Sequence, residues 1–159
     1  MRKRRIGDGF HRRALAAVAG CAMAAGLGCG GASTPQSAPL IFEGAPAVTV
    51  ASASGALSVA VWWSPAQPTV GYAAGQLAIT DQAGAPVAGA TLTVVPWMPA
   101  HGHGASVQAT ITETAPGVYT ATPLDFFMSG AWVLRTRIQR SGDGESPVDD
   151  TAQPPINIP

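Results

Sequence analysis

The sequence predicts an all-β domain, an immunoglobulin-like antiparallel β-sandwich of about seven strands, and three observations support this fold class. From residue 47 onward apolar residues recur with period two, which is typical of strands with one buried face. The apolar runs are short and are separated by glycine, proline and aspartate, which favour tight turns. No stretch beyond residue 28 has the spacing of an amphipathic helix, so we expect the apolar faces to pack as two sheets.

The β-sandwich domain is expected to span residues 47–140. Its candidate strands are, in order, 47–52, 56–63, 76–80, 90–96, 106–113, 117–122 and 131–138. The alternation is clearest in "LSVAVWW", where one face carries Leu57, Val59, Val61 and Trp63. In "AWVLRTRI" Trp132 faces away from Arg135 and Arg137, so Trp63 and Trp132 are both predicted to be buried.

The connections between these ranges also favour antiparallel strands. "DQAGAPVAG" at 81–89 has the glycine and proline of a tight reversal, and "ETAPG" at 113–117 is typical of a hairpin turn. Residues 64–75 are expected to form a longer crossover. The segment 141–159 is acidic and rich in proline, so it is predicted to be a mobile tail.

The N-terminal residues 1–28 are predicted to be a lipoprotein-type signal peptide. Residues 1–13 carry six of the nine basic residues, and the apolar stretch "ALAAVAGCAMAAGLG" follows them. A basic head before a short apolar segment is typical of an export signal, and this one is too short and too glycine-rich for a permanent membrane span. We therefore expect an exported protein, in the periplasm or on the outer surface.

Both cysteines lie within or just beyond this segment, and each resembles the lipidated cysteine of bacterial lipoproteins. Cys29 follows an apolar core of ordinary length, whereas Cys21 follows the better local match, "VAGC", but leaves a shorter core. We predict lipidation at Cys29, with Cys21 as the alternative. Residues 29–46 are then expected to form a flexible tether between the membrane and the domain.

The charge balance beyond residue 28 excludes two classes of partner. That part of the chain has three arginines and eight carboxylates, so its net charge is −5. Nucleic acid is not an expected partner, because phosphate binding needs clustered Lys and Arg. Electrostatic attachment to anionic lipid is also disfavoured, so membrane contact is expected to come from the lipid anchor.

Strand parity places two loops at the same end of the sandwich. If strand 90–96 ends at one end, strand 106–113 runs away from that end and strand 117–122 returns to it. The loop 97–105 and the loop after residue 122 therefore meet at one end. Between them these loops hold every methionine and histidine beyond residue 28, namely Met98, His101, His103 and Met128.

These four side chains are candidate metal ligands. Thioether sulfur is soft and imidazole is borderline, a combination that favours copper, Cu(I) in particular, over magnesium, calcium or zinc. Gly102 and Gly104 allow the backbone to bend so that the two histidines converge. In the other interpretation the methionines plug the end of the sandwich and the histidines are merely solvated, and the residues alone leave both open.

The order "DQAGAPVAGATLTVVPWMPAHGHG", "ETAPGVYTAT" and "FFMSGAWVLRTRI" resembles the YtkA-like and FixH-like family of exported or membrane-tethered bacterial domains, over roughly residues 74–140. The positions that match the family pattern are Met98, Pro99, His103, Met128, Gly130 and Trp132. His101 stands where a second methionine is usual, which leaves a copper ligand but no clear preference between Cu(I) and Cu(II). The resemblance implies a role in copper handling, including supply to respiratory oxidases.

We therefore predict a lipid-anchored, extracytoplasmic copper-binding domain that acts as a carrier or assembly accessory. Its expected partner is a copper-accepting membrane protein or oxidase. Catalysis is not expected, because the sequence has no nucleophile elbow and no evident carboxylate to orient the histidines. The alternative is a non-catalytic immunoglobulin-like structural or interaction module without metal, in which tryptophans supply the contact surface.

Overall fold

The computed structural model describes residues 39–142 and 147–159, and these residues form two antiparallel β-sheets with no helix. The all-β class and the sandwich of two sheets are thereby confirmed. Among the described residues, none forms a helix with the length and hydrophobicity needed to cross a membrane. The predicted signal peptide and both candidate lipidation sites, Cys21 and Cys29, lie outside the described residues.

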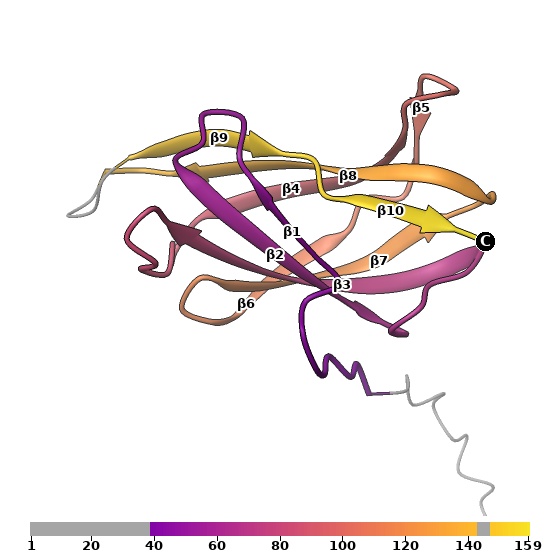
Figure 1. The fold of residues 1–159 in the computed structure, drawn as a ribbon, viewed down its shortest axis with the longest axis horizontal. Coiled ribbons are helices and arrows are strands. Elements are labelled where there is room, and N and C mark those ends of the chain that lie inside the picture. Colours follow the sequence, from indigo (N-terminus) through magenta and orange to yellow (C-terminus); the bar gives the residue numbers. More distant parts are fainter. Residues whose placement is uncertain (1–38, 143–146) are drawn as a thin grey trace, which may run out of the picture. The chain divides into compact units, whose positions relative to one another are not determined.

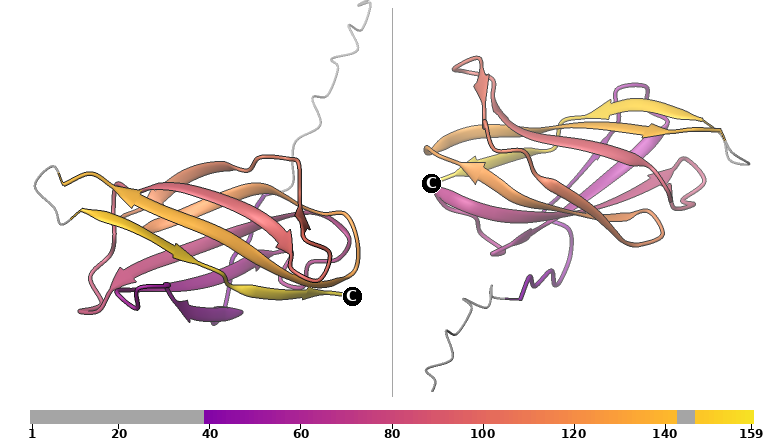
Figure 2. Two further views of the ribbon diagram at one scale, coloured as in Figure 1. Left: turned by 90° about the horizontal axis from the view of Figure 1, so that it is seen from above. Right: turned by 180° about the vertical axis from the view of Figure 1, so that it is seen from behind.

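Ten strands make up the two sheets (Figure 1). The first sheet has the order β1 (Val48–Ala51), β2 (Leu57–Ser64), β3 (Gly71–Asp81), β7 (Val118–Phe126) and β6 (Thr110–Ala115). The second has the order β10 (Pro155–Ile158), β8 (Gly130–Arg140), β4 (Thr91–Met98) and β5 (His103–Gly104), and β9 (Val148–Ala152) pairs with the other half of β8. Figure 2 shows the two sheets facing each other in both views.

The seven predicted strands are all present, with shifted ends. They correspond to β1 to β4 and β6 to β8, while β5, β9 and β10 are additional. The predicted strand 106–113 begins only at residue 110, and the crossover 64–75 shrinks to 65–70 because β3 starts at Gly71.

The C-terminal segment is a correction to the sequence prediction. Instead of a mobile tail over 141–159, its described part contains β9 and β10, which cover the outer edge of β8. Ala152 and Ile158 are buried between the sheets. Pro155 is tolerated because it is the first residue of an edge strand, where a missing N–H costs no ladder bond. The domain therefore extends to residue 158, not 140.

The described end of the predicted tether also contacts the sandwich. The Ile41 amide donates to Ser64 Oγ at 3.2 Å, and Trp62 Nε1 donates to the Gly44 carbonyl at 3.0 Å. The segment from residue 41 is therefore fastened to β2, and the predicted tether of 29–46 is shorter than expected.

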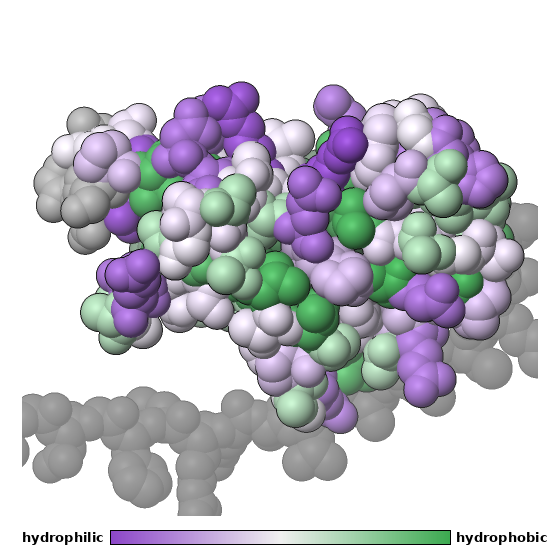
Figure 3. Space-filling view, turned by 45° about the horizontal axis from the view of Figure 1, so that its top comes forward, coloured by the Kyte–Doolittle hydropathy of each residue, from purple (hydrophilic) through white to green (hydrophobic). Residues whose placement is uncertain are grey.

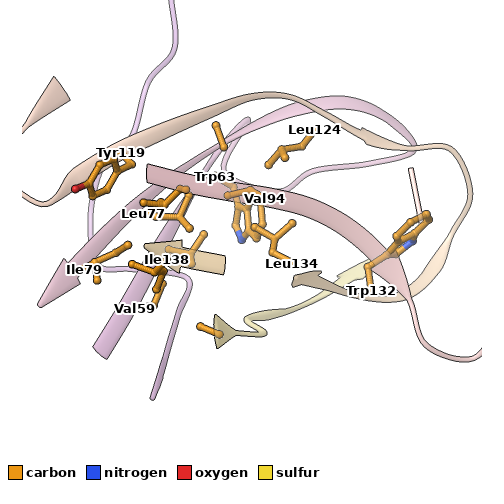
Figure 4. Packing of buried hydrophobic residues seen from close by; sticks show 14 of the residues in the cluster. Val59, Trp63, Leu77, Ile79, Val94, Tyr119, Leu124, Trp132, Leu134 and Ile138 are labelled. Atoms are coloured by element: carbon orange, nitrogen blue, oxygen red, sulfur yellow. The ribbon is translucent and has the colours of Figure 1, made fainter. Parts of the chain in front are cut away.

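The core lies between the two sheets, as Figure 4 shows for its central side chains. Trp63 and Trp132 are 5% and 1% exposed, which confirms that both are interior. Phe126 stands edge-on to both rings, with centroids 6.1 and 5.6 Å away. On the face in Figure 3, hydrophobic residues form small separate patches among hydrophilic ones, as expected for a domain that buries its apolar faces.

Pairing of β4 with β8 and of β3 with β7 fixes which loops share an end. Trp97 is opposite Val133, and Gly71 is opposite Phe126, so the ends of β4 and β7 lie beside the starts of β8 and β3. We call this end of the sandwich, which comprises loops 99–102, 127–129 and 65–70, the Met–His end. The opposite end comprises turns 52–56, 82–90 and 116–117. The predicted placement of the two ligand loops at one end is confirmed.

Candidate metal centre

The first ligand loop is a tight hairpin between β4 and β5. The amides of His101 and Gly102 both donate to the Met98 carbonyl, at 3.2 and 3.0 Å, and Gly102 has a φ of +67° that favours glycine. After this turn Met98 is paired with His103 and Trp97 with Gly104. A side chain at Gly104 would place its Cβ 2.8 Å from the Pro96 carbonyl oxygen, so glycine is needed for the close approach.

The hairpin brings the two imidazole rings together. The centroids of His101 and His103 are 5.5 Å apart, with 51° between the ring planes. Metal–nitrogen bonds are about 2.0–2.1 Å long, so two imidazoles on one ion have centroids roughly 4–6 Å apart. Within residues 39–142 and 147–159 neither imidazole makes a hydrogen bond. His101 is exposed and His103 half-buried, so their nitrogens are available to a ligand from solvent.

Met98 lies under this hairpin and belongs to the hydrophobic core. Its side chain is 1% exposed. Residues paired directly across antiparallel strands share a face, so Met98 and His103 project to the same side. The Met98 methyl group also reaches the start of β8, because a Cβ at Gly130 would lie 3.1 Å from Met98 Cε. Met98 therefore lies against the start of β8 as well as under the hairpin, and its side chain is covered from solvent.

Aromatic rings hold the second loop against the first. Phe127 stacks on His103 with centroids 5.4 Å apart and 30° between planes, and it stands edge-on to Trp132 at 5.1 Å. Trp132 Nε1 donates to the Met128 carbonyl at 3.1 Å, which fixes the backbone of this loop. The Met128 side chain is partly buried and packs against the core.

The four predicted ligands therefore differ in how they are placed. His101 and His103 form a ring pair at the surface, Met98 lies beneath His103, and Met128 follows the residue that stacks on His103. Both methionines pack with the core, as the alternative interpretation expects. The two histidines make no hydrogen bond within the described residues, which both interpretations expect.

Sequence reasoning did not identify Phe127 as part of this group. Its only signal was its position directly before Met128. Trp97 faces the other way: Arg135 lies over its ring at 3.5 Å, and its neighbour Met98 points inward. Phe127 and Trp132, not Trp97, line the His103 side of the loops.

The chemistry available here depends on sulfur. Within the described ranges no three His, Cys, Asp or Glu side chains lie close enough to hold a metal. Two imidazoles alone make an incomplete site, and the soft donors at the same end of the sandwich are the thioethers of Met98 and Met128. Imidazole with thioether suits copper and does not suit magnesium or calcium.

The match to a known family agrees with the YtkA-like part of the sequence resemblance. Residues 52–137, more than half of the chain, match the family described as YtkA-like. A similar solved structure is the crystal structure of a DUF4785 family protein from Legionella pneumophila subsp. pneumophila str. Philadelphia 1, with 12% identity and a TM-score of 0.47. That alignment covers 65% of this chain and 29% of that chain. No curated protein matches the chain.

Proposed function

The chain belongs to the YtkA-like family, and we propose that it is a lipid-anchored, extracytoplasmic copper-binding domain that carries copper or assists in copper handling. The observation that supports the proposal is the pair of imidazoles, which make no hydrogen bond within the described residues and lie at the same end of the sandwich as Met98 and Met128. Cys29, or alternatively Cys21, carries the lipid. The role is non-catalytic, and the partner is a copper-accepting membrane protein or oxidase.

The arrangement suggests an order of capture. His101 and His103 are accessible from solvent and bind the ion first, whereas the buried Met98 thioether is reached only if the hairpin shifts. Thioether sulfur is a soft, polarisable donor, so it holds the soft Cu(I) ion more readily than the harder Cu(II) ion. We therefore expect Met98 and Met128 to contribute mainly to Cu(I) binding, and the two histidines to bind either oxidation state.

The test is an anaerobic titration of the metal-free chain with Cu(I) against a competing chelator, repeated in air with Cu(II). His103→Ala is expected to lower affinity for both ions by about 100-fold, since even the partners that orient a ligand are worth about 10–100-fold. Met98→Leu is expected to lower Cu(I) affinity only. It conserves volume, so its effect on the free energy of unfolding should stay below about 1.5 kcal/mol.

Thr114→Ala is the matched control, because Thr114 is exposed at the opposite end. It should leave both titrations unchanged. Unchanged affinity in both His103→Ala and Met98→Leu would remove these residues from the site.

One observation favours a second candidate function. Burial of Met98 is what a purely structural methionine would show, and it favours a non-catalytic structural or protein-interaction module without metal. In that case Trp97 under Arg135 is the contact feature, since tryptophan and arginine are enriched where binding energy concentrates. A chain that never competes with the chelator for copper would favour this second function.

A further inference from the structure

Large hydrophobic side chains that remain exposed are few, and all of them lie towards one end. Within the described ranges they are Leu40 (45% exposed), Ile41 (56%), Val70 (51%), Tyr72 (68%) and Phe127 (43%). Tyr72 is opposite Asp125 near the end of β7, and Phe127 follows that strand. Ile41 donates to Ser64, the last residue of β2. Since Ser64 pairs with Ala74 near the start of β3, all five belong to the Met–His end.

Carboxylates are distributed in the opposite way. Four of the six described carboxylates lie at or near the opposite end, namely Asp81, Glu113, Asp149 and Asp150. Glu43 and Asp125 are the two near the Met–His end. Arg137 and Arg140 also lie at or near the opposite end, and Arg137 pairs with Asp149, so net charge does not distinguish the two ends. The domain is polarised in its exposed large apolar side chains, which lie towards the Met–His end.

From this distribution of exposed apolar side chains we propose that the Met–His end rests on the lipid surface of the membrane, with the opposite end directed away from it. The proposal rests on the lipid anchor in the proposed function and does not require copper. Tyrosine and phenylalanine with aliphatic neighbours suit the membrane interface. The occupant of this end is thus the bilayer surface.

The chain's entry point supports the same orientation. The described segment begins at residue 39, beside the end of β2, so the tether reaches the domain at its apolar end. From a lipidated Cys29 to residue 39 the chain spans at most about 35 Å, even fully extended. Such a short connection keeps the domain at a high effective concentration near the bilayer, so a weak apolar contact is enough to orient it.

Orientation can be measured by NMR on the isotope-labelled full chain, carrying its lipid, in phosphatidylcholine nanodiscs. A small fraction of the lipid bears a gadolinium-chelating headgroup, and no copper is added. Amide relaxation should be enhanced several-fold more at Val70, Tyr72 and Phe127 than at Thr114 and Asp149. The double variant Val70→Ser, Tyr72→Ser should lose this difference, whereas Thr112→Ser, on an exposed strand away from the patch, should keep it.

Each other outcome counts against the proposal. Equal enhancement at both ends would overturn it and leave a membrane protein, not lipid, as the occupant of the apolar end. A difference that survives the double variant would show that the exposed side chains do not make the contact. No enhancement anywhere would mean that the chain is not attached to the membrane, and the proposed lipid anchor would then be wrong. Copper binding would still be tested independently by the chelator titration.

Discussion

The two ends of the sandwich use their polar side chains differently. At the opposite end Tyr119 donates to the Val87 carbonyl at 2.6 Å and accepts from the Ala90 amide at 2.9 Å. The Glu113 carboxylate accepts from the amides of Gly89 and Gly117. At the Met–His end the imidazoles of His101 and His103 make ring contacts and, within the described ranges, no hydrogen bond.

This difference separates loops that close the fold from loops that are free to bind. A buried polar group that loses its partner costs more than its hydrogen bond contributes, so the opposite end has little freedom to change. Burial also raises the pKa of the Tyr119 phenol, which keeps its proton on the oxygen that donates to Val87. The imidazoles of His101 and His103 are under no such constraint, so their nitrogens are available to a ligand.

The strongest way to break this comparison is to remove the Tyr119 hydroxyl. Tyr119→Phe leaves the Val87 carbonyl and the Ala90 amide without their partner, so the free energy of unfolding should fall by about 1–3 kcal/mol. Copper affinity should not change. Denaturant unfolding and the chelator titration measure the two effects.

Tyr72→Phe is the matched control for that variant. Tyr72 is 68% exposed, so loss of its hydroxyl should change stability by no more than about 0.5 kcal/mol. If both variants destabilise equally, the opposite end is not fastened by Tyr119.

Phe127→Leu is expected to have a smaller effect and the reverse pattern, with copper affinity lowered and stability nearly unchanged. Phe127 stacks on His103, and such ring pairs are worth about 0.5–1.5 kcal/mol, so copper affinity should fall roughly threefold to tenfold. Stability should change little because Phe127 is 43% exposed. A loss of stability with unchanged copper affinity would show that Phe127 only packs, and the proposed separation of the ends would fail.

Strand alternation was enough to predict most of the fold and the meeting of the two loops. The end at which each loop lies depends only on the number of antiparallel strands between the loops. Errors of several residues in the predicted strand ends therefore did not change the predicted placement of the loops. The same alternation also indicates that Met98 is buried. Leu92, Val94 and Pro96 are buried on one face of β4, and two more residues of the same strand bring Met98 into line with them.

The C-terminal strands could not be predicted in this way. In "VDDTA" the inward positions are held by Val148, Asp150 and Ala152, which give a weak apolar signal, and pairing with β8 decides their conformation. The contact of Phe127 with His103 joins two loops from different sheets and leaves no periodic pattern. Both features depend on tertiary contacts that local sequence does not specify.

The weakest expected effect lies at Asp150, which links β9 to the turn after β1. Partial burial raises the pKa of this carboxyl, but hydrogen bonds from Ser52, Ser54 and the Thr151 amide outweigh it, and the net pKa is lowered. A lowered pKa stabilises the fold above the unfolded-state value and ceases to do so as the pH falls through the folded value. Asp150→Asn should therefore be less stable than the natural chain at pH 7.

The pH dependence decides whether that loss comes from the carboxylate. The stability difference should shrink below about pH 4, where the aspartate becomes protonated in the unfolded chain as well. Asp149→Asn makes the same charge change one residue away. Its pKa is lowered mainly by a hydrogen bond from Arg137, but that pair is exposed, so its loss should matter less. Urea unfolding from pH 3 to 7 compares the free energies of unfolding of the two variants. If Asp150→Asn is less stable than the natural chain by the same amount at every pH, the loss comes from packing. The carboxylate charge would then contribute less to the stability of the opposite end than its hydrogen bonds suggest.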